Sequence, residues 1–554
     1  SKVECGTSTP VTNEELTITT TFFNSEAKPA TIKSITYAIG GEPIGTATDP
    51  ITLAASSTQD VEFKYTPTKA RIMTVRITAV IEQDGKEYTF TKDVTLDVLD
   101  ASKLVYIGID ASHYNEYVAG NYKDSMGNFG ELAAAYSVRT VTLKTSEELI
   151  AACGNSKYKA IILTAPSRRL EAAQKDPKTY STEELNAIKT FNDNGGMVIL
   201  AGWSDNYENY PIIQNNPDIK HMAATQNEVL AKLGSSLRIS DDATYDDERS
   251  AADGVDKWRL YFSSYNMENP LLKGVEFDAE HPYDKLYTER FSHYGGASIY
   301  AVDASGNATS TLPATVSPAV YGHATTYSVD VDKDGLGGAG IPKYTFAKND
   351  DRLMVMASEQ LEGKGLIIVS GAAFMSNFEV QYQVSDSGAE KNYSNYKICQ
   401  NLVSMLNQTE ITKIADVQAE TEEGVKFTVE GIVTSNASGY DKDTAFFDCI
   451  YVQDNTAGIN AFPVAGNFKI GDKVRVTGWT SSYQGERQLA VTKIEKIADA
   501  EAPAPVEVTA AQINDGSVLG SLVKIKGTIT RVEEAEGKIQ TIMVRDAAGN
   551  EARV

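Results

Sequence analysis

Hydrophobic and polar residues alternate with a period of two through residues 1–100. The alternation is clearest in the runs 16–23, 61–65 and 75–81, and turn-forming pairs such as Gly40-Gly41 and Asp84-Gly85 separate such runs. Period-two alternation is typical of β-strands that bury one face. Several short strands within about 100 residues predict a two-sheet β-sandwich.

From residue 101 to residue 408 the pattern changes to short apolar runs separated by amphipathic stretches. The runs are 104–109, 138–143, 160–163 and 197–200. Residues 181–184 form a capping box, after which Leu185, Ile188 and Phe191 share one helix face. Residues 145–148 have the same helix-start pattern. Buried strands that alternate with capped helices predict a flavodoxin-like parallel sheet with both faces covered.

A long insertion, about 205–350, interrupts this unit. It is rich in Tyr, Asp and Gly, and we expect it to be irregular. The strand pattern resumes at 353–357 and 366–369, and a helix is predicted at 393–406. Insertions of this length usually cover the carboxyl ends of the strands, where open α/β sheets bind ligands.

Alternation returns at 411–498, and a weaker copy occupies 506–554. Residues 429–433 recur 96 positions later at 525–529, and residues 451–454 recur 92 positions later at 543–546. Gly431 within a strand, Gly458 in a turn and the run 471–478 predict a five-stranded OB-type barrel. The second copy has no counterpart of 471–474, so we expect 506–554 to be a partial barrel and the chain to be a piece of a longer protein.

Composition narrows the classes of partner. The chain of 554 residues is long enough for three or four domains, and no apolar run approaches the ~20 residues that a membrane span needs. Its net charge of −24 argues against general nucleic-acid binding and suits an extracellular surface, and solvated acidic faces are its favoured explanation. The four cysteines lie far apart, neither at metal-ligand spacing nor dense enough for a disulfide scaffold. We expect mostly buried thiols.

Three segments resemble known families. Asn24 and the stretches 53–57 and 63–67 resemble bacterial immunoglobulin-like domains of the CARDB kind, which implies a spacer or adhesive module over 1–100. The barrel segment 411–498, through 451–454, 471–478 and 483–489, resembles OB-fold modules of secreted bacterial nucleases and nucleotidases. That likeness implies a catalytic domain of such a class outside the chain.

The segment 101–408 resembles the class I glutamine amidotransferase-like fold. Gly202, Trp203, Ser204 and Asp205 follow the strand 197–201, where that family places its reactive Cys. The closing segment 363–374 lacks the family's His-x-Glu pair. The segment therefore resembles the non-catalytic relatives found in bacterial surface and gliding-type proteins.

Residues after successive strands form a candidate ligand site, because the carboxyl ends of parallel strands meet at one edge of a sheet. They are His113, Arg168, Arg169, Trp203 and Ser204. The arginines could bind a carboxylate or phosphate, or could equally pair with acidic loops. As an alternative, Ser204 could be the nucleophile of a serine hydrolase, with His221, His293 or His323 from the insertion as its base.

The order Asp330-x-Asp332-x-Asp334-Gly335 is the first half of an EF-hand-type calcium loop. It predicts a Ca²⁺ site, although position twelve is Ile341 rather than Glu and Pro342 follows it. A solvated acidic turn is the alternative. Another acidic cluster, Asp241-Asp242 with 246–248, is spaced too irregularly to predict a site.

In the barrel, Tyr451, Trp479 and Tyr483 could stack bases or sugars. Residues 411–500 hold nine Lys or Arg against thirteen Asp or Glu, so no positive track for a nucleic-acid backbone is expected. Together these patterns predict a non-catalytic accessory or binding region of a large secreted or cell-surface bacterial protein. The predicted partner of this region is an unidentified ligand or protein. The alternative functions are a serine hydrolase that uses Ser204 and a barrel that binds glycans or nucleic acid.

Overall fold

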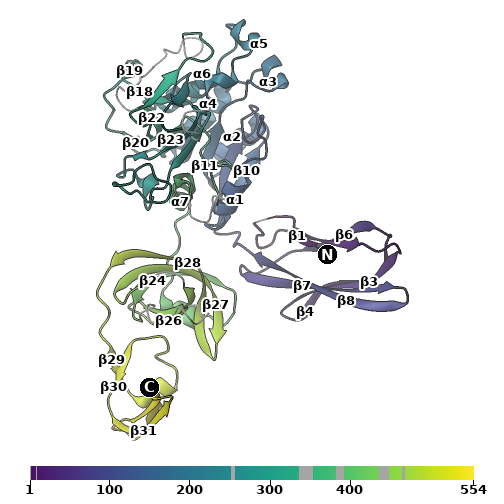
Figure 1. Ribbon diagram of the computed structural model, residues 1–554, viewed down its shortest axis with the longest axis vertical. Coiled ribbons are helices and arrows are strands. Elements are labelled where there is room, and N and C mark those ends of the chain that lie inside the picture. Colours follow the sequence, from purple (N-terminus) through teal and green to yellow (C-terminus); the bar gives the residue numbers. More distant parts are fainter. Residues whose placement is uncertain are drawn as a thin grey trace. The chain divides into compact units, whose positions relative to one another are not determined.

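The computed structural model describes residues 2–7, 9–250, 256–335, 353–381, 392–435, 448–464 and 468–554. They fall into two compact units (Figure 1). One contains Ser1–Ala101 and Thr409–Val554, and the other contains Ser102–Gln408. The chain is therefore multidomain and rich in β-structure. None of the described helices is both long and apolar enough to cross a bilayer.

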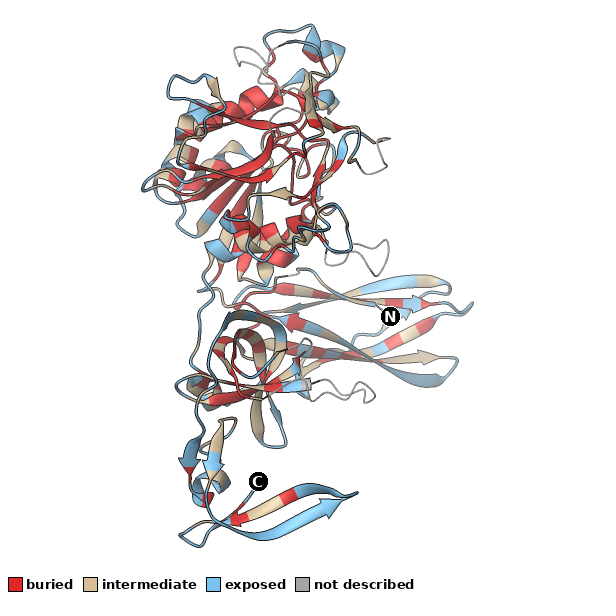
Figure 2. Ribbon diagram, turned by 60° about the vertical axis from the view of Figure 1, so that its left-hand side comes forward, coloured by how far each residue is buried: buried red, intermediate tan, exposed pale blue. Residues whose placement is uncertain are grey.

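The N-terminal part of the first unit consists of two antiparallel sheets around one core. One sheet has the order β1 (Lys2–Cys5), β2 (Leu16–Asn24) and β6 (Ser57–Tyr65). The other has the order β4 (Glu42–Ala47), β3 (Ala30–Ile39), β7 (Ile72–Gln83) and β8 (Lys86–Asp97), with β5 (Ile51–Leu53) paired to β3. Alternate residues such as Ile18, Ile35 and Val75 are buried in the core, as the period-two pattern predicts. Figure 2 shows buried and exposed residues along the same strands.

The second unit is built on a mixed sheet with five parallel strands. These are β10 (Val138–Leu143), β9 (Val105–Asp110), β11 (Tyr158–Thr164), β12 (Met197–Ala201) and β23 (Ile367–Ser370), in that spatial order. Beyond β23 the sheet continues with β22 (Met354–Glu359), β18 (Ile299–Val302) and β13 (Leu237–Ile239), which pair antiparallel to their neighbours. The predicted parallel sheet is therefore confirmed from β10 to β23, whereas β22, which follows the same pattern in the sequence, is antiparallel to β23.

Helices cover both faces of the sheet. α1 (Gly127–Ala134) and α7 (Ser394–Leu406) pack on one face with Ile107, Ile162 and Ile199. On the other face lie α2 (Ser146–Gly154), α4 (Thr182–Asp193) and α6 (Met222–Leu233). The predicted helix starts are confirmed, because Thr145 caps α2 and Ser181 with Glu184 forms the capping box of α4.

The insertion is more regular than expected. It contains η1 (Asp205–Tyr207), α5 (Pro211–Gln214) and η2 (Pro270–Leu272), and it adds β13, β18, β19 (Ala308–Thr309), β20 (Val316–Tyr321) and β16 (Ser264–Tyr265) to the main sheet. Two further ladders join β14 (Ala243–Asp246) to β21 (Thr326–Val329) and β15 (Arg259–Phe262) to β17 (Phe291–Tyr294). These strands are two to six residues long and most pair with distant segments, so local periodicity does not reveal them.

The predicted five-stranded barrel is present. β24 (Lys426–Val433), β25 (Asp448–Gln453), β26 (Gly458–Val464), β28 (Glu486–Asp499) and β27 (Asp472–Tyr483) form a closed barrel. α8 (Ile414–Ala419) packs its Ile414 and Val417 into the same core. A Cβ on Gly431 would lie 2.6 Å from Val452 Cγ1, which explains the glycine in that strand.

The C-terminal segment repeats part of this order. It contains β29 (Val506–Val508), α9 (Ala510–Asn514), β30 (Val523–Ile525) and a three-stranded sheet of β31 (Thr528–Ala535), β32 (Lys538–Arg545) and β33 (Glu551–Arg553). Asp454 accepts a hydrogen bond from the first amide of α8, at Ile414 N (3.0 Å), and Asp546 accepts one from the first amide of α9, at Ala510 N (2.9 Å). The sequence repeat is therefore also a repeat of helix capping.

The four cysteines are free thiols in different environments. Cys153 and Cys399 are buried, Cys5 is half-buried and Cys449 is exposed. The expectation of mostly buried thiols holds for two of the four.

Candidate functional site

The loops that follow β9, β11 and β12 bring the five predicted ligand residues to the carboxyl edge of the sheet. Of these five, Ser204 lines the cavity found there, and the other four are not among its lining residues. The predicted ligand-binding role of the five residues stays a prediction.

Arg168 is fully buried and its guanidinium is surrounded by protein acceptors. Nε donates to Lys220 O at 2.9 Å. The terminal nitrogens donate to three further carbonyls and to the hydroxyl of Thr225; the carbonyls are those of Pro166, Ser167 and Lys178. A guanidinium has five N–H donors, so this arrangement leaves no donor directed at a carboxylate or phosphate ligand.

Arg169 and Trp203 belong to an aromatic cluster. Trp203 is buried and stacks on Tyr207 with ring centroids 3.6 Å apart and an interplanar angle of 11°. The Arg169 guanidinium lies over the rings of Tyr122 and Tyr207, at 5.9 and 5.5 Å from their centroids. Trp203 thus supports Tyr207 from behind, and Tyr207 itself lines the cavity.

His113 lies in a buried polar group between β9 and α4. Its Nδ1 is 2.8 Å from Asp110 Oδ2, and its Nε2 is 3.5 Å from Glu184 Oε2. Burial lowers the pKa of His113, but the hydrogen bonds to Asp110 and Glu184 outweigh it and raise that pKa to about 9. His113 is therefore a charged group that joins the strand end to the helix.

Ser204 begins the short helix η1. Its Oγ accepts a hydrogen bond from Asn206 N at 3.1 Å and donates to Asp205 Oδ1 at 3.4 Å. The described hydrogen bonds of the three candidate bases lead elsewhere: His221 contacts Asp241, His293 contacts Thr244 and His323 contacts Tyr261. Ser204 is thus a helix cap, and none of the described hydrogen bonds joins it to a histidine.

A cavity of about 150 Å³ lies next to Ser204. Tyr207, Tyr245 and Trp258 supply its aromatic surface, and Ser204, Asn206 and Thr244 supply polar groups. The remaining lining residues are Ala243, Gly295 and Gly296. A Cβ on Gly295 would lie 2.6 Å from the Tyr207 hydroxyl, so a glycine is needed where this loop passes the tyrosine.

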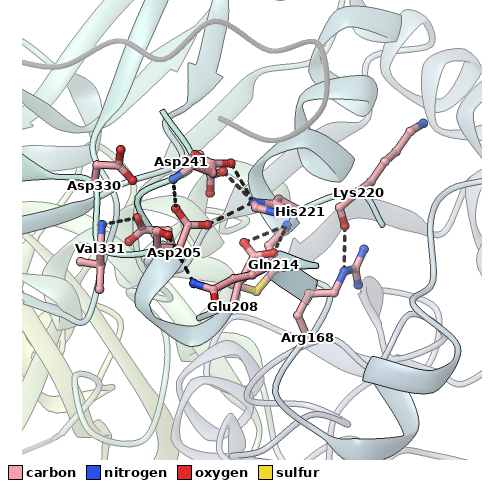
Figure 3. A network of polar contacts seen from close by, with 12 residues as sticks. Arg168, Asp205, Glu208, Gln214, Lys220, His221, Asp241, Asp330 and Val331 are labelled. Carbon is pink, nitrogen blue, oxygen red and sulfur yellow. Dashed lines mark hydrogen bonds and ion pairs between the residues drawn. The ribbon is translucent and has the colours of Figure 1, made fainter. Parts of the chain in front are cut away.

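Beside the cavity, acidic side chains from separate segments converge on His221 (Figure 3). Asp205 comes from η1, His221 directly precedes α6, Asp241 follows β13, and the loop 330–334 follows β21. His221 Nδ1 lies 2.8 Å from Asp241 Oδ2, 3.6 Å from Asp332 Oδ2 and 3.8 Å from Asp334 Oδ2. A second group of mutually close carboxylates joins Asp205, Asp330 and Asp332.

The backbone holds this acidic loop in place. Asp205 Oδ2 accepts a hydrogen bond from Val331 N at 2.8 Å, which ties the loop to η1. Within the loop, Asp330 accepts from Lys333 N and from Gly335 N, and Asp332 Oδ1 accepts from Asp334 N. Asp332 Oδ2 is buried and accepts no hydrogen bond among the described residues. Ile341 and Pro342, which occupy the last part of the predicted calcium loop, lie outside the described residues.

The cluster carries an excess of buried negative charge. Burial raises the pKa of Asp205, and repulsion from Asp241, Asp242 and Asp332 adds to this effect, so that it reaches about 8. Burial and repulsion likewise raise the pKa values of Asp332 and of Glu208. For His221 burial lowers the pKa, but hydrogen bonding to Asp241 and the surrounding carboxylates raise it to about 10. Carboxylates that repel each other in this way favour a bound cation.

The barrel aromatics lie on its outer surface or rim. Tyr483 is 63% exposed, Trp479 is half-buried, and the Tyr451 hydroxyl donates to Glu486 Oε2 at 3.1 Å. Because neither Trp479 nor Tyr483 is buried in the core, the glycan- or nucleic-acid-binding alternative stays a prediction. The acidic balance of this segment continues to argue against nucleic acid.

No family model and no curated protein matches the chain. Among solved structures, one described as the mmIFT52 N-terminal domain is similar at 12% identity and a TM-score of 0.32, over 55% of this chain and 99% of that chain. A family 123 glycoside hydrolase from Clostridium perfringens is similar at 11% identity and a TM-score of 0.15, over 35% and 43% of the two chains. β-Glucuronidase 2 from Bacteroides uniformis is similar at 12% identity and a TM-score of 0.16, over 42% and 31%. At these scores the likenesses do not indicate an activity for this chain.

Sequence reasoning missed half of the acidic site and most of the cavity. His221 was expected only as a base for Ser204, Asp205 only as part of the turn, and Asp241 only as part of an irregular cluster. Tyr207, Tyr245 and Trp258 carried no signal of their own. Only the Asp330-x-Asp332-x-Asp334 spacing pointed to the acidic site, because its other ligand candidates come from distant segments.

Proposed function

We propose that this chain is a non-catalytic binding region of a larger secreted or cell-surface bacterial protein. In this proposal an Ig-like sandwich, an OB-type barrel and a partial second barrel act as spacers, and the amidotransferase-like α/β unit binds a small neutral ligand in the cavity beside Ser204. A catalytic domain, nuclease- or nucleotidase-like, would lie outside the chain. The observation that carries the binding role is the cavity with aromatic walls at the carboxyl ends of the strands.

The lining residues favour a neutral ligand with one ring. None of the nine lining residues has a charged side chain, and the described contacts of Arg168 and Arg169 are with protein groups. A cavity of this volume holds one six-membered ring, since an apolar cavity of ~150 Å³ binds benzene. Aromatic faces next to hydroxyl and amide groups suit a ring with an apolar face and polar edges. A monosaccharide unit has this chemistry.

Trp258 provides a direct test, because it lines the cavity and is 42% exposed. Titration of the full chain with neutral monosaccharides and oligosaccharides is expected to change tryptophan fluorescence in a saturable way. Trp258→Ala and Tyr245→Ala are each expected to weaken binding at least about tenfold, because each removes an aromatic wall.

Tyr287→Ala is the matched control, since Tyr287 is 47% exposed and does not line the cavity. Binding that survives both cavity substitutions, or that Tyr287→Ala weakens equally, would place the ligand elsewhere. If no neutral ring ligand binds at all, the proposed role of the cavity is wrong.

The serine hydrolase alternative makes a separate prediction about the same residue. A serine nucleophile would react with a fluorophosphonate probe, and Ser204→Ala would abolish the labelling. We expect no labelling above that of Ser204→Ala, because the Ser204 hydroxyl contacts Asn206 and Asp205 rather than a histidine.

A further inference from the structure

His221 and Asp332 are the centre of a second site, which is independent of the cavity ligand. Asp332 is 8% exposed, and its Oδ2 accepts no hydrogen bond among the described residues. The nearest cationic group that contacts this oxygen is His221, at 3.6 Å from Nδ1. A buried carboxylate oxygen without a hydrogen-bond donor is costly, and a metal ion would remove that cost.

The distances around His221 fit the edges of a small coordination polyhedron. Ligand atoms of His221, Asp241, Asp332 and Asp334 all lie within 4.8 Å of one another. A tetrahedron around Zn²⁺ with bonds of about 2.1 Å has edges of about 3.4 Å. The three distances from Nδ1, 2.8, 3.6 and 3.8 Å, lie on both sides of that value.

The donor types decide between metal classes. An EF-hand-type Ca²⁺ site uses six to eight oxygen ligands, whereas imidazole nitrogen is preferred by transition metals. The group around His221 offers one nitrogen and three carboxylates. The three carboxylates supply the negative charge that a dication would neutralise, and the ion would take the place of the contact between Nδ1 and Asp241.

We propose that His221, Asp241, Asp332 and Asp334 bind a divalent transition-metal ion, with Zn²⁺ as the best fit. The Asp330-x-Asp332-x-Asp334 turn then supplies two ligands of a zinc site, Asp332 and Asp334, rather than the first half of a calcium loop. Because Asp205 adjoins the cavity residues Ser204 and Asn206 and is tied to the loop through Val331, the ion fixes the loop after β21 beside the cavity.

The test is metal binding to the full chain after chelator treatment and dialysis. Calorimetry is expected to show one equivalent of Zn²⁺ bound, more tightly than Ca²⁺, with a higher melting midpoint for the metal-bound protein. Co²⁺ at the same site is expected to give the visible absorption bands of a tetrahedral ion. His221→Gln should weaken Zn²⁺ binding by at least about 100-fold, because it removes the nitrogen ligand.

Asp332→Asn keeps the inference testable even if His221→Gln folds poorly. It keeps the shape of the side chain but removes a buried, repelled charge. The metal-free variant should therefore melt at or above the midpoint of the metal-free wild type, while its Zn²⁺ binding is lost. A stable Asp332→Asn protein that still binds Zn²⁺ with wild-type affinity would overturn the assignment.

An exposed pair of the same type serves as control. His281 Nδ1 lies 3.5 Å from Asp278 Oδ1 on the surface, and His281→Gln should leave Zn²⁺ binding unchanged. Two further outcomes would contradict the inference. One is Ca²⁺ binding that His221→Gln does not affect, which indicates an all-oxygen site, and the other is no binding of either ion. Neither outcome affects the cavity test, which is carried out with a neutral ligand and different variants.

Discussion

Arg168 and Arg169 are neighbours in the chain but differ completely in environment. The first is buried and donates to carbonyls from three segments, and the second lies over tyrosine rings beside the cavity. By donating hydrogen bonds to the carbonyls of Ser167 and Lys220, the Arg168 guanidinium connects the loop after β11 to the start of α6. The strand-end edge is therefore positioned by a buried charge, and its cavity is left uncharged.

At the same scale, His113 predicts a pH-dependent stability. Its pKa in the folded protein is raised to about 9, above the value of about 6.5 for an unfolded chain. Because folding raises this pKa, protonated His113 stabilises the folded state. The contribution is complete below pH 6.5 and is lost as the pH rises through 9. His113→Gln should therefore destabilise the α/β unit by on the order of 3 kcal/mol at pH 6 and by much less at pH 9.5.

Urea unfolding followed by tryptophan fluorescence, in a Trp479→Phe background, reports on the unit that contains Trp203 and Trp258. The exposed His281→Gln is the control. Equal destabilisation by His113→Gln at both pH values would mean that His113 acts by packing alone.

At the scale of elements, the repeat predicts equivalent roles for two aspartates. Asp454 and Asp546 each accept a hydrogen bond from the first amide of a short helix. Each aspartate also accepts hydrogen bonds from backbone amides of the turn that directly follows the aspartate itself. Loss of such a cap typically costs about 1–2 kcal/mol. Asp454→Ala should thus speed hydrogen exchange of the α8 amides about tenfold or more, and Asp546→Ala should do the same for α9.

Hydrogen exchange read by mass spectrometry on the full chain separates the two helices. Asp499→Ala is a suitable control, because its side chain is 92% exposed and only pairs with Lys496. If Asp454→Ala changes exchange in α9 as much as in α8, the effect is not local capping.

At the scale of the whole molecule, Ser102–Gln408 has the properties of an independent folding unit. Its two cores, on opposite faces of the sheet, are made entirely of residues from this segment. Its ends lie together, because Asn407 Nδ2 donates to the carbonyls of Lys103, Tyr136 and Ser137. Domains with adjacent ends and their own cores usually fold alone.

Residues 102–408 expressed alone should therefore unfold cooperatively and keep the near-ultraviolet circular dichroism of packed aromatics. A shorter version that ends at 391 should not, because α7 contributes Ile398 and Leu402 to the core. A molten 102–408 segment would show that this unit depends on the rest of the chain.

The sequence alone determined the elements whose signals are local. The strands around Ile18 and Ile161, the caps at Thr145 and Ser181, and the five-stranded barrel follow from periodicity and capping patterns, because backbone hydrogen bonding and burial act on neighbouring residues. The insertion was misjudged as irregular, since its strands are short and find their partners far along the chain.

Only the tertiary structure decided the candidate sites. His221, Asp241 and Asp332 come from three separate segments, and no spacing rule connects them. Likewise, Trp258 and Tyr207 share a cavity because the insertion folds back over the end of β12. Side-chain chemistry could be read from the sequence, but the cost of burying several carboxylates together appears only when the fold brings them within a few ångströms of one another.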